Sequence, residues 1–400
     1  MEYGTNKHPP FRDDPPLLVG DLPAEYIPSY VASPPTGGPA SRDGTNTSGK
    51  RLLVVGDVHG HLDALKALLR KVGFDNTNGD HLILVGDLVT KGPDSKGVVR
   101  FAMELGASAI RGNQEDKVLA AAREIHRRSG EDSPGAGDDD ANNGAETASG
   151  TDRHARAIAR SLSRAQLEWL RTRPIILRIG NIPGAASPPW NASTLAVVHG
   201  GLVPGPPLEE QDPWAVMNMR SLVYPGTKQP ATDGVDARPP HAVAVPISGR
   251  EGEPWSHAWN RHQNHLPPSA PHTLAIYGHD ARKGLQASPK VDISPYRSSP
   301  ASLLEDEEAE DGEEGGSDDD ETADTSNNNN NNNNKKKKKD RKDRKHNKKK
   351  KDKKKGKEQG LRYAFGLDSG CGHGKQLTGL VIEATAEGVR GWVAQVECAG

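Results

Sequence analysis

Residue types that bind metals follow short apolar runs at three successive points of the chain. The runs 52–55, 82–85 and 107–110 each end in a turn that contains glycine, and apolar residues at helical spacing follow each turn. This pattern predicts three strand–turn–helix units. The carboxyl ends of such strands form one edge of a sheet, where α/β proteins place their active sites, so the polar side chains there are expected to meet. These residues are Asp57, His59, Asp87 and Asn113.

Two later runs deliver histidines in the same way. The runs 195–198 and 273–277 are typical of strands, and His199 and His279 follow them. The whole set offers two carboxylates, three imidazoles and one amide, which suits Zn, Mn, Fe or Co better than Mg or Ca. We therefore predict a dinuclear site with one bridging aspartate, because two ions about 3.5–4 Å apart can clamp a phosphoryl group and generate hydroxide at neutral pH. Taken alone, His199 also fits a structural strand-end histidine and Asn113 a turn former.

The composition indicates one core domain that carries long insertions. Hydrophobic residues make up 33 % and aromatic residues 4 % of the 400 residues, and the chain contains 44 Gly and 31 Pro. Such values are typical of chains with unstructured segments. We expect a disordered lead-in rich in Pro and Gly over residues 1–50 and the core domain over 51–400, with low-complexity insertions at 129–152 and 288–360.

The second insertion joins an acidic block to an asparagine run and a lysine-rich block, residues 335–357. Blocks of like charge do not fold. The lysine-rich block can attract an anionic partner such as nucleic acid or polyphosphate, or act as a nuclear localisation signal, whereas a tolerated loop expansion is the plainest interpretation. The chain shows no apolar run of transmembrane length and no secretory leader. We therefore expect a soluble, cytoplasmic monomer, with the nucleus as an alternative.

Other elements follow from periodicity and turn residues. Residues 204–271 are expected to be rich in loops. The last strands should be antiparallel because their polarity alternates. The predicted helices are 98–105, 115–128 and 164–171, the last capped by Ser163, and the remaining predicted strands are 175–179, 363–367, 377–383 and 389–396.

The chain has only two cysteines, Cys371 and Cys398. We interpret both as buried small apolar residues rather than nucleophiles, because neither has a recognisable catalytic partner. So few cysteines allow one bridge at most and favour a reducing compartment.

The order and spacing of five motifs resemble the calcineurin-like metallophosphoesterases. The motifs are GDVHG, GDLVTKGPDS, RGNQE, HGGL and YGHD. Within that family the chain resembles the branch of phosphoprotein phosphatases and symmetrical diadenosine-tetraphosphatases, and the tail GLDSGCGHGKQLTGLVI is similar to the latter. KGPDS is similar to the eukaryotic homologues of that hydrolase, which include a zinc-dependent vacuolar endopolyphosphatase; this adds the vacuole as an alternative compartment.

The resemblance implies an α/β fold of two packed mixed β-sheets flanked by helices. It also implies that Asp57 and His59 bind the first metal and that Asp87 bridges. Asn113, His199 and His279 would then bind the second metal. The implied reaction is direct attack of a metal-bound hydroxide on phosphorus, without a covalent enzyme intermediate.

Two departures from the family pattern bear on the substrate. Protein phosphatases have a histidine general acid, held by an aspartate, where this chain has Gln114 and Thr90. Glutamine cannot protonate a leaving group, and general acids contribute typically about 10²–10⁴-fold. A phosphoanhydride needs this help least, so inorganic polyphosphate is the first predicted substrate. A serine/threonine phosphoprotein phosphatase, a dinucleoside polyphosphate hydrolase and a catalytically weak scaffold are the alternatives.

Three basic residues are predicted to contact substrate. Lys91 replaces the arginine of the family's second motif and keeps its charge but not its bidentate geometry. Arg220 follows HGG at a distance similar to that of the family's phosphate-binding arginine. Arg111 fits substrate binding or a structural salt bridge about equally well. Asp87, Gln114, Lys91 and Arg220 are thus the predicted catalytic residues, and Asp368 is expected to position the core.

Overall fold

The computed structural model describes residues 16–30, 49–129, 150–225, 243–287 and 361–398. All of them belong to one compact unit, and the other unit, Arg297–Gly360, lies outside the described residues. The predictions for most of the two insertions therefore fall outside the description. Among the described residues, no helix is long and apolar enough to cross a membrane.

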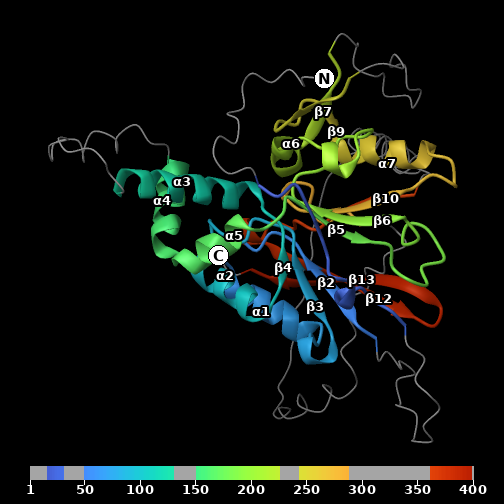
Figure 1. Cartoon of the computed structure of the whole chain (residues 1–400), viewed down its shortest axis with the longest axis horizontal. Coiled ribbons are helices and arrows are strands. Elements are labelled where there is room, and N and C mark those ends of the chain that lie inside the picture. The colour runs from blue at the N-terminus through green and yellow to red at the C-terminus, as the bar shows by residue number, and fades with distance from the viewer. Residues whose placement is uncertain (1–15, 31–48, 130–149, 226–242, 288–360, 399–400) are drawn as a thin grey trace, which may run out of the picture. The chain divides into compact units, whose positions relative to one another are not determined.

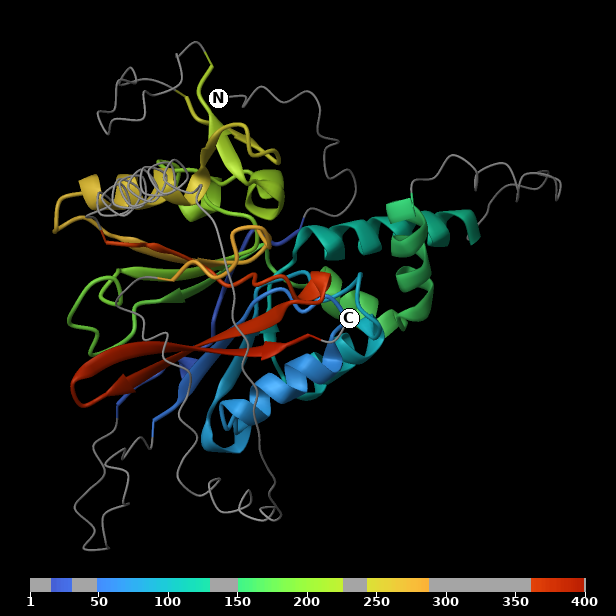
Figure 2. The same ribbon diagram turned by 180° about the vertical axis from the view of Figure 1, so that it is seen from behind.

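The first five-stranded sheet combines parallel strands with an antiparallel hairpin. Strands β2, β3 and β4 run parallel, and β12 pairs antiparallel with both β2 and β13. The hairpin lies beside β2 in both views (Figures 1 and 2). In spatial order the strands are β13 (Gly388–Glu397), β12 (Gln376–Thr385), β2 (Arg51–Val55), β3 (His81–Leu84) and β4 (Ser108–Ala109).

Helices cover the outer face of this sheet (Figure 1). Helix α1 buries Leu65 and Leu68 in a cluster that includes Leu53 and Val55 of β2. Asp94 caps α2, and α5 begins with a capping box formed by Ser163 and Gln166, as predicted for Ser163. The helices are α1 (Leu62–Lys71), α2 (Ser95–Glu104), α3 (Asn113–Ser129), α4 (Gly150–Ser161) and α5 (Arg164–Arg171).

The second five-stranded sheet packs face to face on the first. Alternate residues of β2, such as Leu52 and Val54, share a buried cluster with Leu195 and Val197 of β6. This apolar layer confirms two packed sheets, because each contributes one face to a common core. In spatial order the strands are β1 (Val19–Asp21), β5 (Ile176–Gly180), β6 (Thr194–Val198), β10 (Thr273–Tyr277) and β11 (Ala364–Gly366).

The far face of the second sheet carries a third sheet and two helices (Figure 1). Residues 204–271 are therefore not simply rich in loops; most of these elements have only two to six residues, and Pro and Gly are frequent between them. Met217, Met219, Trp255 and Trp259 are buried there. The elements are α6 (Pro213–Asn218), β7 (Ser221–Val223), β8 (Val245–Ile247), β9 (Glu253–Pro254) and α7 (Trp255–His265).

Three further predictions were wrong. Part of the expected lead-in forms β1, which pairs with β5 and is followed by the buried Leu22. Helix α4 was missed because it follows directly on a stretch without periodicity. Strand β11 is parallel to β10, since a long connection rather than a hairpin joins them. Short 3-10 helices lie at Ala24–Tyr26, Asn76–Asn78, Leu208–Glu210 and Cys371–His373.

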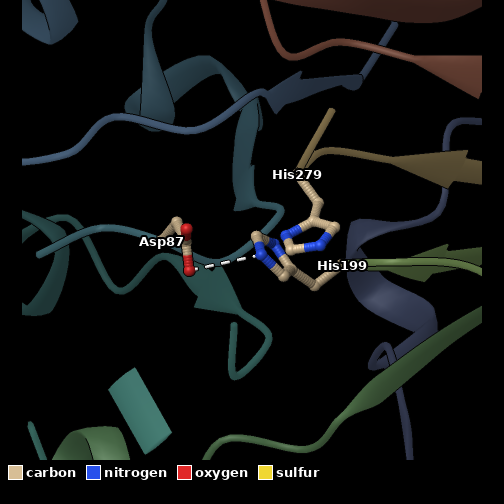
Figure 3. A group of neighbouring side chains, drawn as sticks. All are labelled: Asp87, His199 and His279. Carbon is tan, nitrogen blue, oxygen red and sulfur yellow. Dashed lines mark ion pairs between the residues drawn. The ribbon is translucent and has the colours of Figure 1, made fainter. Parts of the chain in front are cut away.

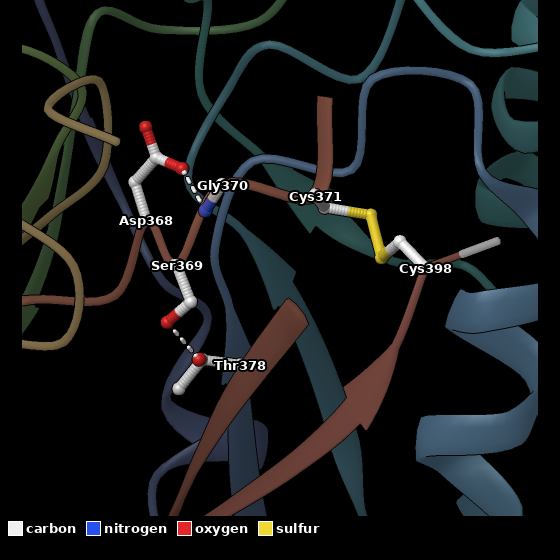
Figure 4. The surroundings of a disulfide bond; sticks show 6 residues. All are labelled: Asp368, Ser369, Gly370, Cys371, Thr378 and Cys398. Carbon is white, nitrogen blue, oxygen red and sulfur yellow. Dashed lines mark hydrogen bonds between the residues drawn. A yellow bond between two sulfur atoms is a disulfide. The ribbon is translucent and has the colours of Figure 1, made fainter. Parts of the chain in front are cut away.

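The two cysteines are bonded to each other, which corrects their interpretation as separate apolar residues. Cys371 and Cys398 are both buried and form a disulfide with a Cα–Cα distance of 5.4 Å (Figure 4). The bond joins the segment after β11 to the residue that follows β13. Because disulfides persist in oxidising surroundings, the cysteine count no longer favours a reducing compartment.

Candidate metal centre

The predicted ligands meet at one edge of the two sheets. Strands β2 and β3 and the start of α3 supply four of them, and β6 and β10 of the second sheet supply the two histidines. The carboxyl ends of all these strands point to the same place. The structure therefore brings together every residue of the predicted set, and all but the half-buried Asn113 are buried: Asp57, His59, Asp87, His199 and His279.

Asp87 lies at the centre of the cluster. Its Oδ1 is 3.2 Å from Nε2 of His199, and its Oδ2 is 3.6 Å from Nε2 of His59. Figure 3 shows the Asp87 carboxylate directed at His199, with the His279 ring alongside. Two groups of potential ligands share Asp87, one with Asp57 and His59 and one with His199 and His279. This is the arrangement that a bridging carboxylate requires.

Each histidine turns one nitrogen to a backbone carbonyl and the other to the cluster. Nδ1 of His199 lies 2.9 Å from the carbonyl oxygen of Val85, and Nδ1 of His59 lies 3.2 Å from that of Val89. A carbonyl oxygen only accepts, so each of these Nδ1 atoms carries a proton, and Nε2 is the nitrogen that the ring presents to the carboxylates. His279 is reversed, because its Nε2 contacts the carbonyl oxygen of Asn218 at 3.1 Å. Such contacts fix the tautomer of histidines that bind metals.

Lone pairs also converge at Asn113. Its Oδ1 lies 3.1 Å from Nε2 of His199. If the amide oxygen and nitrogen exchange places, the nitrogen donates to Asp87 at 3.1 and 3.2 Å. The first orientation brings an amide oxygen, an imidazole nitrogen and a carboxylate oxygen together, which either a bound metal or the protonated form of His199 makes favourable. The donor set thus fits a divalent metal of the Zn, Mn, Fe or Co type.

The backbone at the cluster adopts conformations that cost energy. All non-glycine residues with positive φ in the described part of the chain belong to the site or to the segment beside it. Such conformations persist only where the surrounding structure holds them, and they concentrate at functional sites. The residues are His59 (47°), Asp87 (51°), Thr90 (73°), Lys91 (64°) and His279 (69°).

Two glycines let the strand ends approach each other. A Cβ atom at Gly278 would lie 2.0 Å from Oδ1 of Asp57, and one at Gly112 would lie 2.5 Å from both N and Oδ1 of Asp87. The backbone of Gly278 can therefore pass beside the Asp57 carboxylate, which accepts a hydrogen bond from the His279 amide at 3.1 Å. Any larger residue at either glycine would displace a ligand.

Glu115 holds the turn that carries Asp87, a role that the sequence reasoning missed. It is fully buried, and its carboxylate accepts backbone N–H groups from Asp87 at 2.7 Å, Leu88 at 2.8 Å and Val89 at 3.2 Å. It also accepts the N–H of Gly112 at 2.8 Å. Burial, together with the charge of Asp87, raises the pKa of Glu115 to about 7.

The surroundings shift the pKa values of the Asp57 and Asp87 carboxyl groups in opposite directions. Burial raises the pKa of Asp57, and the neighbouring charge of Asp368 raises it further. Burial also opposes ionisation of Asp87, but the charges of His199 and His59 hold the pKa of that carboxyl well below its usual range. Asp87 is therefore the permanent anion of the centre. Burial likewise disfavours the charged form of His199, yet Asp87 raises the pKa of that imidazole to about 10.

Lys91 and Gln114 lie at the rim of the cluster. Nζ of Lys91 is 2.7 Å from Nε2 of His59, so a cationic group contacts the nitrogen that faces the carboxylates. The backbone N–H of Gln114 donates to Oδ1 of Asp87 at 2.9 Å, and its side-chain Oε1 accepts a hydrogen bond from the Thr90 hydroxyl at 3.3 Å. Gln114 and Thr90 thus contact each other, although neither can serve as a general acid.

The two predicted arginines lie in different surroundings. Nη2 of Arg220 donates to the carbonyl oxygen of His279 at 3.4 Å, which puts this guanidinium beside the centre. Arg111 is buried, and its Nη2 donates to the carbonyl oxygen of Arg171 at 2.8 Å. Its Nη1 lies 3.4 Å from Oδ1 of Asp116. These contacts favour the structural interpretation of Arg111 over substrate binding.

Two more charged residues, Arg250 and Asp368, contribute to the surroundings of the ligands. Arg250, which the sequence reasoning missed, forms an ion pair with Asp280, the residue after His279. Long, sparsely patterned loops supply such residues, so spacing alone gave no signal. Asp368 is buried and accepts a hydrogen bond from the Gly370 amide at 3.0 Å (Figure 4). Its negative charge raises the pKa of the Asp57 carboxyl.

Comparisons with known proteins agree with this geometry. The sequence model of the calcineurin-like phosphoesterase family matches residues 50–293. A symmetrical bis(5'-nucleosyl)-tetraphosphatase of Pectobacterium atrosepticum is 48 % identical over 81 residues, which are 20 % of this chain and 28 % of that protein. The same-named enzyme of Methylococcus capsulatus is 32 % identical over 149 residues, 36 % of this chain and 46 % of that protein. The chain thus matches less than half the length of these curated relatives.

Among solved structures, the chain is similar to a protein provisionally described as a diadenosine tetraphosphatase. The two are 22 % identical with a TM-score of 0.49, and the match covers 95 % of this chain and 97 % of the other.

Proposed function

The chain belongs to the calcineurin-like phosphoesterase family, and we propose that it is a metal-dependent hydrolase of phosphoanhydride bonds, with inorganic polyphosphate as its first substrate class. One observation carries the choice of substrate. The ligand cluster is complete, whereas the rim position of the family's general acid holds Gln114 in contact with Thr90.

The ligand cluster supports metal-assisted hydrolysis with two ions of the Zn, Mn, Fe or Co type. Asp57 and His59 would hold one ion and His199, His279 and Asn113 the other, with Asp87 shared. When bound, such ions supply a hydroxide nucleophile at neutral pH and neutralise charge on the phosphoryl oxygens. The backbone carbonyls behind the three histidines keep a lone pair of each ring aimed at the cluster.

The rim determines which leaving group can depart. Gln114 can donate a hydrogen bond to a leaving oxygen but cannot transfer a proton. A serine alkoxide needs that proton, while a phosphate departs from an anhydride as a weak base. General acids are worth typically about 10²–10⁴-fold, so the rim favours anhydrides over phosphate esters.

Cationic side chains beside the cluster can hold the phosphate that is attacked. Lys91 reaches His59 from the segment after β3, and Arg220 reaches the His279 carbonyl from the connection between α6 and β7. A substrate phosphate between them would meet one point charge and one planar fork of donors. These two residues orient the substrate and do not transfer protons.

Dinucleoside polyphosphates are the second candidate substrate class. They contain the same anhydride bonds, and the curated relatives are named as symmetrical bis(5'-nucleosyl)-tetraphosphatases. A phosphoprotein phosphatase and a catalytically weak scaffold that binds through the charged insertion remain as the alternatives that the experiment must separate.

The test measures hydrolysis of long-chain polyphosphate, diadenosine tetraphosphate and a phosphoserine peptide by the full chain, with and without added Zn, Mn or Co. Asp87→Asn removes the shared carboxylate, and Asp63→Asn, at an exposed residue of α1, is the matched control. We expect metal-dependent cleavage of polyphosphate by the wild type and the control but not by Asp87→Asn. Turnover of the phosphopeptide alone would overturn the proposal. Inactivity on all three substrates would also overturn it and would favour the catalytically weak scaffold.

A further inference from the structure

A second group of basic side chains gathers around a single carboxylate next to the metal centre. The carboxylate is Asp280, which is buried and follows the ligand His279 directly. Arg250 forms an ion pair with its Oδ1, and Nζ of Lys283 lies 3.6 Å from its Oδ2. We call Arg250, Lys283 and Arg362, together with Asp280, the Asp280 cluster.

Arg362 joins this cluster from the residues that precede β11. Its Nη1 is buried, and it has no hydrogen-bond acceptor among the described residues. Burial lowers the pKa of Lys283, and the charges of Arg250 and Arg362 act in the same direction, against the attraction of Asp280. The positive charge of Arg362 thus acts on Lys283.

The positive charges of the cluster exceed its negative charge. Asp280 offers one negative charge to the three cations of the cluster, and its Oδ2, 3.6 Å from Nζ of Lys283, makes no hydrogen bond in the described part of the chain. Arg220 approaches from the metal centre, and its buried Nε has no acceptor among the same residues. Burying an unpaired donor of this kind costs free energy unless an acceptor reaches it. An anion with several oxygen atoms would meet both unpaired arginine donors and offset the mutual repulsion of the cations.

The cluster is continuous with the metal centre. Arg220 donates to the carbonyl oxygen of His279, and its pKa is lowered by burial and by Arg250 but raised by the charge of Asp87. One guanidinium therefore experiences both the central carboxylate of the metal site and a cation of the Asp280 cluster.

The side chains at the entrance of the cluster are accessible. The exposed fraction of the side chain is 40 % for Arg250 and 25 % for Lys283, against 7 % for Asp280. Solvent thus reaches the cations while the carboxylate lies beneath them. Half-buried Arg and Lys side chains of this kind bind phosphate oxygens through charge-assisted hydrogen bonds.

We propose that Lys283 and Arg362, with Arg250, form a second anion subsite that binds the phosphates of a polyphosphate chain beyond the one that is hydrolysed. The inference rests on the proposed function, because only a substrate with several linked phosphates could occupy the metal centre and the subsite together. Inorganic polyphosphate and a dinucleoside polyphosphate offer the same chain of phosphates to it.

The test measures affinity without turnover. Thermal-shift titrations of the full chain in buffer with excess chelator give dissociation constants for tripolyphosphate, orthophosphate and diadenosine tetraphosphate. The chelator prevents tripolyphosphate from acting through bound metal, and binding to the lysine-rich residues 335–357 is common to all variants. The variants are Lys283→Gln and Arg362→Gln, with Lys96→Gln and Arg70→Gln as matched controls at exposed residues of α2 and α1.

Loss of one charge-assisted contact should weaken tripolyphosphate binding about tenfold in each variant. The ratio of tripolyphosphate to orthophosphate affinity should fall by a similar factor, because tripolyphosphate spans several cations of the subsite whereas orthophosphate contacts fewer of them. The two controls should keep the ratio of the wild type. A parallel loss for diadenosine tetraphosphate would show that the subsite accepts both sources of linked phosphates, and a loss for tripolyphosphate alone would restrict it to the inorganic chain.

Unchanged ratios in both variants would overturn the subsite. If Arg362→Gln does not fold, the more exposed Lys283→Gln decides alone. The binding result does not depend on catalysis. If the wild type binds tripolyphosphate through Lys283 but does not cleave it, the proposed function is wrong and the subsite stands. Cleavage of polyphosphate by Lys283→Gln with the affinity ratio of the wild type contradicts the subsite and not the proposed function.

Discussion

The ligand cluster and its rim differ in how their side chains are held. The ligands follow directly on the ends of buried strands, and three of them have positive φ, so the backbone itself aims each short side chain. The rim residues Lys91 and Arg220 reach the centre with long side chains that make one or two contacts each. Substitutions in the cluster should therefore abolish function, whereas substitutions at the rim should change selectivity.

The Asp87 carboxylate should show the largest effect. Asp87→Asn keeps the shape of the side chain but removes the anion that faces both His59 and His199. We expect kcat to fall by about 10³-fold or more, since several kcal/mol of transition-state stabilisation depend on the shared metals. Mass spectrometry of the purified variant should find less than the metal content of the wild type. A variant with full metal content and activity would show that Asp87 does not bridge.

Glu115 tests whether the cluster depends on the turn beneath it. Glu115→Gln replaces one of two acceptor oxygens by a donor that faces the N–H groups of Asp87 and Gly112. Loss of an outer contact of this kind typically costs about 10- to 100-fold in metal affinity or activity. The measurement is kcat as a function of metal concentration, and we expect its midpoint to move to a higher metal concentration. A wild-type midpoint would confine Glu115 to a role in folding.

The same variant predicts a pH dependence. The pKa of Glu115 is raised to about 7 in the folded protein, so the folded state binds this proton more tightly than the unfolded chain does. The stability from this group is complete below its unfolded pKa of about 4.3 and is lost as the pH rises through about 7. Denaturant unfolding in the presence of a chelator should therefore show a decline between pH 5 and 7.5 that is smaller in Glu115→Gln. Equal declines would contradict the raised pKa.

At the rim, a double substitution should add an activity rather than remove one. Gln114→His with Thr90→Asp places an imidazole and a carboxylate where the two side chains now contact each other. A general acid there should speed hydrolysis of an alkyl phosphate by about tenfold or more and leave polyphosphate cleavage little changed. The ratio of the two rates measures the effect. An equal change on both substrates would show that the rim does not select the leaving group.

The cluster was predictable from sequence because strand ends carry their ligands at fixed offsets. Asp57, His59 and Asp87 follow short continuous apolar runs, and the length of these runs and the glycine that ends each one identify the strands. The same reasoning could not identify Arg250 or Lys283, because their contacts with Asp280 depend on how the β8–β9 turn of the third sheet and the segment after β10 meet. Arg111 illustrates the converse, since it lies beside a motif but packs against the end of α5.

The elements of the fold also differ in how far the sequence predicts them. The parallel strands and their helices were predicted within a few residues, whereas β1, β9 and the direction of β11 depend on partners distant in sequence. Strand β1 has three residues and no amphipathic pattern, and only pairing with β5 makes it a strand. The disulfide was likewise invisible, because the residues between Cys371 and Cys398 contain the β12–β13 hairpin that brings them together.

That disulfide should affect stability more than catalysis. Closing a loop with a sequence separation of 27 residues stabilises the folded state by about 3.5 kcal/mol in the chain-entropy model. Cys371→Ser with Cys398→Ser should lower the free energy of unfolding by about that amount, as measured by denaturant titration, and reduction of the wild type should do the same. A Cβ atom at Gly372 would lie 2.3 Å from Cδ2 of His59, so the tethered segment packs on a ligand, and we also expect a few-fold weaker response to added metal. Equal free energies of unfolding for the oxidised and the reduced protein would mean that the β12–β13 hairpin alone holds this segment against the cluster.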